Sequence, residues 1–312
     1  MYKRQFPPLV TGVVVLMIGF SLLKVGFKYA GGGVWLMNNK PEIFANWHHL
    51  SIAGTVLIVA LLTNLRGKGM VSAASILIGI IAGFIVAAML GEIRWAKIAA
   101  ASWFAFPMPL QYGIDFVWGA VILMLFMSVV TTIETIGDIS ATTMGGANRE
   151  ATDKELSGGI MADGVGTAFA SIFNAMPNTS YSQNAGLVAF TGVISRHVGT
   201  VAGVILILLG LFPKLGGIIA AMPDSVIGGA AIIMFGLIAG AGIKLISKSE
   251  MSQRNVLILA LSLSFGIGLY AFPEFVAHVP DLGIKLGLLL TTGLIPAGLL
   301  AFILNATLPN KK

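Results

Sequence analysis

Residues 180–192 read SYSQNAGLVAFTG, and within them the chain passes from a polar segment into an apolar one. Pro177 lies just upstream, and proline removes a backbone donor and interrupts helices. Residues 178–182 are Asn, Thr, Ser, Tyr and Ser, which favour extended segments, turns and helix N-caps. We therefore predict a short strand and then a half-helix within 178–190, with the helix beginning near Gln183.

The composition around this stretch is typical of a membrane protein. Of the 312 residues, 56% are hydrophobic and only 10% are charged, whereas soluble domains carry roughly 25% charged residues. So few charges cannot cover a water-facing surface, which favours an all-α polytopic membrane protein. The apolar runs predict ten membrane segments, at 7–29, 49–65, 71–90, 116–144, 157–175, 178–194, 198–213, 224–246, 255–272 and 282–308.

The basic residues predict how these segments are oriented. With a cytoplasmic N-terminus, 12 of the 19 Lys and Arg residues fall on the inside and 7 on the outside, which agrees with the positive-inside rule. We therefore expect both termini in the cytoplasm and a multi-pass protein of the inner (plasma) membrane. Because the basic residues lie singly at helix ends, the net charge of +6 does not indicate nucleic-acid binding.

Small residues in the outer segments predict close helix packing. The first three and last three segments are almost free of acids, and their glycines allow neighbouring helices to approach closely. The glycines concerned are Gly12, Gly19, Gly26, Gly228, Gly229, Gly236, Gly240 and Gly242.

Three acidic residues lie within the predicted apolar segments. Glu134 and Asp138, in VTTIETIGDISATT (130–143), are four residues apart and share one helix face. Asp163 lies in SGGIMADGVGTAFA (157–170), among four glycines. A carboxylate at depth costs about 2.5–3.5 kcal/mol on insertion scales, so these groups should face the protein interior or a wet cavity. They are candidates for ligand binding and proton exchange, with hydrogen-bonded structural acids as the alternative.

The predicted half-helix adds amide groups to these acids. A helix N-terminus at membrane depth is tolerated where protein or cavity water satisfies its backbone, and discontinuous helices of this kind form transporter substrate sites. Gln183 and Asn184 provide both donors and acceptors there. A carboxylate together with amides suits a flat heteroaromatic solute with alternating N–H and C=O groups. The alternative role for the amides is helix capping and hydrogen bonding between helices.

No enzyme is predicted, because the sequence contains no nucleophile–base pair, metal-binding cluster or phosphate loop. Gly31-Gly32-Gly33 lacks the strand–loop–helix and Lys context of a phosphate loop. His48 and His49 are interpreted as interfacial residues at the end of a predicted external loop, 30–48, with a metal site as the alternative. The absence of cysteine excludes disulfides and thiolate metal sites.

These motifs resemble one known family. Gln183-Asn184-x-Gly186-x-x-x-x-Thr191 is similar to the signature of the nucleobase–ascorbate transporters, also called the nucleobase:cation symporter-2 family. The stretches FPPLVTG, ETIGD, ADG and GLFPKLGG look like those of its bacterial xanthine/uric acid permease branch. The resemblance covers essentially the whole chain.

The resemblance implies a fold of fourteen segments in two inverted repeats, with a core domain and a gate domain, in a protein that is usually dimeric. On this scheme, 1–110 holds the first gate-type helices, 111–222 half of the core domain, and 223–312 the second gate-type helices. About ten of the fourteen segments are present. We therefore expect a fragment or a truncated gene that lacks the first four segments, and whether it transports alone stays open.

The resemblance also implies roles for individual residues. Glu134 corresponds to the principal substrate-binding carboxylate, Gln183 to the second direct contact, and Asn184 to its support. Asp138 and Asp163 correspond to residues of the core polar network that take part in proton coupling. Gln183 favours a purine, because uracil carriers have Glu at that position.

The resulting prediction is a symporter that takes up a purine nucleobase such as xanthine or uric acid, with no cofactor or metal. Protons are the expected coupling ion, and Na⁺ is the alternative. The expected partners are the purine, the lipid bilayer and a second copy of the chain. Ala185 stands where many purine carriers have Asn, and Gly192 where fungal and animal members often have a basic residue, so the exact purine stays open. The alternatives are a uracil or other pyrimidine permease, an anion exchanger of sulfate-transporter architecture, and a non-transporting membrane fragment.

Overall fold

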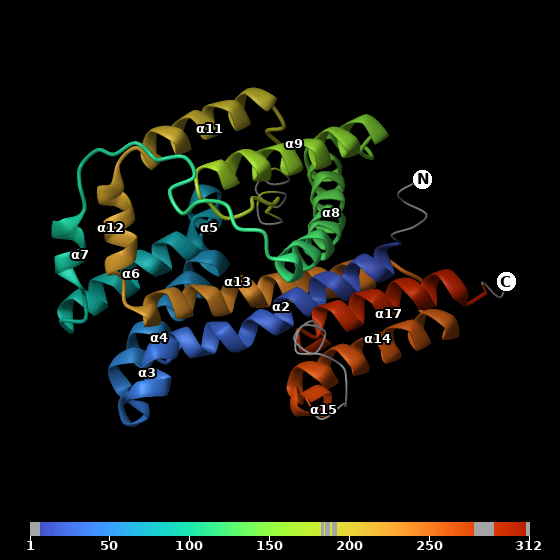
Figure 1. Ribbon diagram of the computed structural model, residues 1–312, viewed down its shortest axis with the longest axis horizontal. Coiled ribbons are helices and arrows are strands. Elements are labelled where there is room, and N and C mark those ends of the chain that lie inside the picture. The colour runs from blue at the N-terminus through green and yellow to red at the C-terminus, as the bar shows by residue number, and fades with distance from the viewer. Residues whose placement is uncertain (1–6, 182–183, 185–187, 189–191, 278–289, 310–312) are drawn as a thin grey trace. The chain divides into compact units, whose positions relative to one another are not determined.

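The computed structural model describes residues 7–181, 184, 188, 192–277 and 290–309. All regular secondary structure in these residues is helical (Figure 1), which confirms the predicted all-α class. The helices are α2 (Pro8–Ala30), α3 (Val34–Asn39), η1 (Pro41–Ile43), α4 (Trp47–Arg66), α5 (Met70–Ala73), α6 (Ser75–Met89), α7 (Trp95–Ala100), α8 (Trp118–Ala147), α9 (Asp153–Ile172), α11 (Arg196–Gly210), α12 (Pro213–Ala221), α13 (Asp224–Ile246), α14 (Gln253–Ala271), α15 (Glu274–Ala277) and α17 (Leu294–Thr307).

Five of the described helices, α2, α4, α8, α13 and α14, are long and apolar enough to cross a membrane. They correspond to the predicted segments 7–29, 49–65, 116–144, 224–246 and 255–272. The pair α11 and α12, bent by 80°, makes a sixth span if it is counted as one. Large apolar side chains remain exposed along these helices, as expected for surfaces that face lipid. The chain is therefore a multi-pass membrane protein.

The remaining predicted segments differ from single long helices. Segment 71–90 is divided at Ala74 into the short helices α5 and α6. Segment 157–175 lies mostly in α9, whose first turn contains Asp153 and Glu155. Residues 182–183, 185–187 and 189–191 of segment 178–194, and residues 282–289 of segment 282–308, lie outside the described residues.

The chain divides into two compact units. Unit 1 consists of Met1–Val25, Phe116–Glu134 and Met234–Lys312, and unit 2 of Gly26–Asp115 and Thr135–Ile233. The predicted division into gate-type and core-type segments, 1–110, 111–222 and 223–312, was drawn on family resemblance and stays a prediction.

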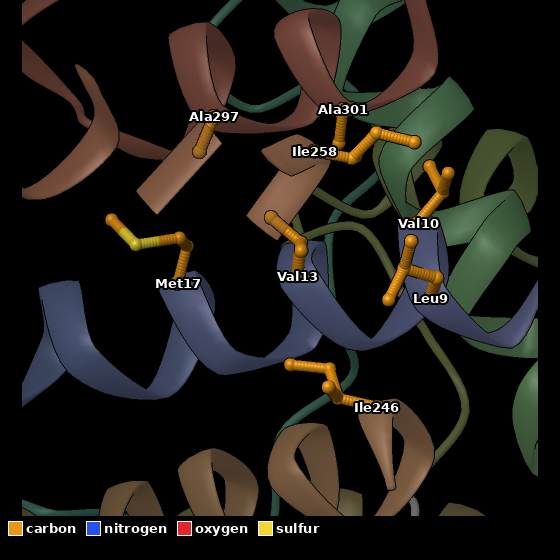
Figure 2. Close-up of a cluster of buried hydrophobic side chains, with 8 residues drawn as sticks. All are labelled: Leu9, Val10, Val13, Met17, Ile246, Ile258, Ala297 and Ala301. Atoms are coloured by element: carbon orange, nitrogen blue, oxygen red, sulfur yellow. The ribbon is translucent and has the colours of Figure 1, made fainter. Parts of the chain in front are cut away.

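The core of unit 1 is built around α2. Apolar residues recur there every three or four positions, so they form a single helical stripe. Figure 2 shows this stripe directed toward α14 and α17, with the end of α13 on the opposite side of α2. The buried residues of this core are Leu9, Val10, Val13, Met17, Ile246, Ile258, Ala297 and Ala301.

Glycines bring α2 and α13 into backbone contact within unit 1. A Cβ at Gly19 would lie 2.7 Å from the carbonyl oxygen of Phe235, and a Cβ at Gly12 would lie 2.6 Å from Cγ1 of Ile246. These distances leave no room for a methyl group, so the predicted close packing is confirmed at these positions. Gly236 and Gly240, by contrast, have open space around them, and there the prediction was wrong.

The core of unit 2 joins α4, α6 and the beginning of α13. Helix α4 packs along α6 (Figure 1), where Gly79 lies against Ala60. The N-termini of α4 and α13 are thereby held in one packed cluster. Its buried members are Ile52, Val56, Ala87, Ile93, Ala221, Val226 and Ala230.

Candidate functional site

Two of the predicted acids, on α8 and α9, hold the irregular segment that follows Pro177. The buried Asp138 of α8 accepts a hydrogen bond from Ser180, with 2.6 Å between Oδ2 and Oγ. Asp163 of α9 accepts one from Asn178, with 2.9 Å between Oδ1 and Nδ2. Each carboxylate therefore fixes one residue of the segment to its own helix, and all of these residues belong to unit 2.

Two threonine hydroxyls extend these contacts into a continuous network. Thr135 of α8, which is 3% exposed, donates to Oδ2 of Asp163 at 3.3 Å and lies 3.4 Å from the Ser180 hydroxyl. Thr167 of α9 donates to Oδ1 of Asn178 at 2.9 Å. The network links two helices to one irregular segment, and we refer to it below as the polar network. Its members are Thr135, Asp138, Asp163, Thr167, Asn178 and Ser180.

A glycine makes room for this network on α9. A Cβ at Gly166 would lie 3.0 Å from Nδ2 and 3.1 Å from Oδ1 of Asn178. Such a methyl group would press on the amide that donates to Asp163. Among the glycines around Asp163, Gly166 thus permits the close approach of Asn178, whereas Gly158 and Gly164 have open space around them.

Hydrogen bonding offsets the cost of burying Asp138 and provides partners for the half-buried Asp163. A hydrogen bond to a charged group contributes about 1.5–3 kcal/mol, and leaving a buried carboxylate without such bonds is costly. The arrangement agrees with the alternative in which the acids are hydrogen-bonded and join helices. Proton exchange at Asp138 or Asp163 stays a prediction.

The third predicted acid, Glu134, lies on α8 four residues before Asp138 and is half-buried. Its spacing from Asp138 places the two on one face of α8, as predicted. Its role as the principal substrate-binding carboxylate is not tested by this geometry and stays a prediction.

The amide residues of the signature are only partly described. Gln183, Gly186 and Thr191 lie outside the described residues. Asn184 is helical and exposed, and its backbone N–H donates to the carbonyl oxygen of Tyr181 at 3.0 Å. The Gly192 N–H donates to the carbonyl oxygen of Val188 at 2.8 Å.

The predicted strand before the half-helix is not found. Residues 175–181 form no strand and pair with no other segment in the described part of the chain. A strand requires backbone hydrogen bonds to a neighbouring strand. This segment is held instead by the side chains of the polar network.

The loop that joins α8 to α9 is fixed by a capping box that the sequence analysis missed. The Thr152 hydroxyl accepts from the Glu155 backbone N–H, and the Glu155 carboxylate accepts from the Thr152 backbone N–H, as the T-x-x-E spacing predicts. Arg149 donates to both carboxylate oxygens of Glu155. The hydrogen bond from Arg149 is the main reason why the pKa of Glu155 lies well below its usual range.

Comparison with known proteins decides the family. A family model described as a permease family, that of the xanthine and uric acid permeases, matches residues 2–275. The chain belongs to this family. It is the nucleobase–ascorbate transporter family that the signature predicted, and it is a family of permeases, not of enzymes.

The similar proteins of this permease family come from several bacteria. The chain is 40% identical over 305 residues to a Clostridium perfringens protein whose name assigns it provisionally to the purine permeases, covering 98% of this chain and 66% of that protein. It is 35% identical over 314 residues to the xanthine permease XanP of Escherichia coli, covering 99% of this chain and 67% of that protein. It is 35% identical over 303 residues to the uric acid permease PucJ of Bacillus subtilis, covering 96% of this chain and 66% of that protein. The chain thus spans about two thirds of the length of the curated relatives it matches.

Proposed function

We propose that this chain is part of a secondary active transporter that takes up a purine nucleobase such as xanthine or uric acid. The names of the relatives support a purine as the solute. The single structural observation that carries the proposal is the anchoring of residues 178–180 by Asp138 and Asp163. This anchoring fixes the segment that leads directly into Gln183 and Asn184.

The chemistry of the proposed site matches the edge of a purine. The Glu134 carboxylate accepts N–H groups of the solute, and the Gln183 amide pairs with an adjacent C=O and N–H. Asn184 supports this contact. Amide and carboxylate groups arranged in this way discriminate strongly against solutes that lack the matching donors, because unmatched polar groups would remain buried.

We propose that proton coupling uses the same contacts. A proton on Asp163 turns one acceptor oxygen into a donor, and it therefore competes with the hydrogen bond from Asn178 or Thr135 at that oxygen. A proton on Asp138 competes in the same way with the Ser180 hydroxyl. Protonation therefore loosens the segment before Gln183, which couples proton binding to the substrate site. Na⁺ coupling is the second candidate, and a protonophore distinguishes the two because it abolishes only proton-driven uptake.

Uptake by cells that lack their own purine permeases tests the proposed solute. We expect radiolabelled xanthine to enter, and unlabelled uric acid to compete better than uracil. Stronger competition by uracil would assign the chain to the pyrimidine carriers. No uptake, with the protein present in the membrane, would favour the non-transporting alternative.

The cellular setting is proposed on the same basis. The chain lies in the inner (plasma) membrane with both termini in the cytoplasm, and two copies form a homodimer. A reporter that is active only in the cytoplasm, fused after Lys312, tests the orientation. Cross-linking in native membranes tests the dimer.

A further inference from the structure

A polar pocket lies within unit 2 where the N-termini of α4 and α13 meet, and none of its lining residues belongs to the polar network. It has a volume of about 510 Å³, within the roughly 300–1,000 Å³ of small-molecule sites. We call it the α4–α13 pocket. Its polar lining consists of Asn46, His49, Glu92, Arg94 and Asp224.

The Gly31-Gly32-Gly33 triplet, which the proposed transport site does not use, makes room for this pocket. A Cβ at Gly32 would lie 2.9 Å from Nε2 of His49, and Gly32 also has a φ of +110° that favours glycine. A Cβ at Gly33 would collide with Oδ2 of Asp224. Two of the three glycines therefore leave space for an imidazole and a carboxylate.

The imidazole is held in a defined orientation. His49 is 8% exposed, and its Nδ1 lies 3.0 Å from the Ser225 hydroxyl. Its backbone N–H donates to the Asn46 side chain, which caps α4. With Nδ1 engaged, Nε2 is the polar atom that His49 can present to the pocket, as a donor or an acceptor according to its tautomer.

The charged groups of the pocket are not satisfied by the protein. Within the described part of the chain, neither the Asp224 carboxylate nor the Arg94 guanidinium has a side-chain hydrogen bond or ion pair. Among the side chains that the structure describes, Glu92 has one ion-pair partner, His48, with 3.8 Å between Oε1 and Nδ1. Polar groups that line a cavity without protein partners are available to water or to a polar ligand.

The ligand class follows from these groups. Two carboxylates accept N–H groups, while one guanidinium donates to carbonyl oxygens. With two carboxylates against one guanidinium, the pocket favours an uncharged solute rich in N–H groups over an anion. Trp35, which is 65% exposed at the pocket, offers an aromatic face to a planar ring.

We propose that the α4–α13 pocket is a second binding site for a small planar solute with adjacent N–H and C=O groups. This rests on the proposed function, because a purine base is the solute of this chemistry that the transporter would meet. On the predicted topology these helix ends face the outside, so the site captures the solute before it reaches the site near Glu134.

Equilibrium dialysis of radiolabelled xanthine against the purified full chain tests the proposal. We expect two sites per chain, and Asp224→Asn should weaken one of them about tenfold or more, because it removes a charged hydrogen-bond acceptor of nearly the same size. Glu42→Gln is the matched control, since Glu42 is exposed on neighbouring η1 and does not line the pocket. Glu134→Gln should remove the other site only.

The outcomes separate this proposal from the proposed function. One site that Glu134→Gln abolishes and Asp224→Asn leaves unchanged would overturn the second site and retain the transport site. One site that Asp224→Asn weakens and Glu134→Gln leaves unchanged would support the α4–α13 pocket and contradict the role of Glu134. Equal weakening by Asp224→Asn and Glu42→Gln would show only a change in surface charge and would overturn the proposal. The absence of any xanthine binding would overturn both.

Discussion

The Ser180→Ala variant removes the shortest hydrogen bond of the polar network. The hydroxyl of Ser180 donates to the Asp138 carboxylate across 2.6 Å, the length of a charge-assisted hydrogen bond. Such a bond contributes about 1.5–3 kcal/mol, so its loss should lower the equilibrium constant for holding the segment in place by roughly 10- to 150-fold. Because this segment leads into Gln183, we expect xanthine uptake to fall and the protein to unfold at a lower temperature.

Ser171→Ala is the matched control for this variant. Ser171 is an exposed serine of α9 whose hydroxyl donates to the carbonyl oxygen of Ala168 in its own helix, at 2.7 Å. Initial rates of xanthine uptake at equal membrane abundance, together with thermal unfolding in detergent, compare the two variants. The reasoning would be refuted if Ser180→Ala and Ser171→Ala gave the same rates and unfolding temperatures. A double-mutant cycle with Asp138→Asn should further give a non-additive effect, because both changes remove one bond.

Three further variants test other contacts. Gly166→Ala should reduce uptake and stability, because the added methyl group would press on the polar network. Gly164→Ala should change neither, because Gly164 has open space around it. Equal effects of the two substitutions would contradict this account. Because the pKa of Glu155 is lowered in the folded state, its ionisation stabilises that state at pH values above the ordinary glutamate pKa. This stabilisation is lost as the pH falls through the lowered pKa. Glu155→Gln should therefore flatten that part of a profile of thermal stability against pH. Gly19→Ala should lower the unfolding temperature because its Cβ meets the backbone of α13, and Gly240→Ala should not; the reverse order would refute the packing.

The helical class and the long spans could be predicted because both depend on local composition. The predicted segment 224–246 coincides with α13, because the apolar run that follows Asp224 ends before a group of polar residues. The break at Ala74 was not predicted, because hydropathy alone does not register an interruption of the helix within an apolar run. Helix contact at Gly19 was predicted but open space at Gly240 was not, since contact depends on which side of α13 faces a neighbour.

The polar network could be predicted only in part. The sequence indicated that Asp138 and Asp163 must face partners, because isolated carboxylates at membrane depth are costly. It did not indicate that Asn178 and Ser180 are those partners, since each pair joins residues that only the packing of α8 and α9 brings together. Residues 178–182 were interpreted by their turn and cap propensities alone. Polar side chains next to a proline within a predicted span were the signal that could have identified them.

The most direct test of the central claim is xanthine uptake by the Glu134→Gln variant, compared with the unchanged chain in cells that lack purine permeases. The substitution keeps the size of the side chain but removes the carboxylate that is proposed to accept the N–H groups of the purine. We predict uptake by the unchanged chain and none by the variant, at equal abundance in the membrane. Uptake by Glu134→Gln at the unchanged rate would contradict the assignment of Glu134, and with it the proposed site.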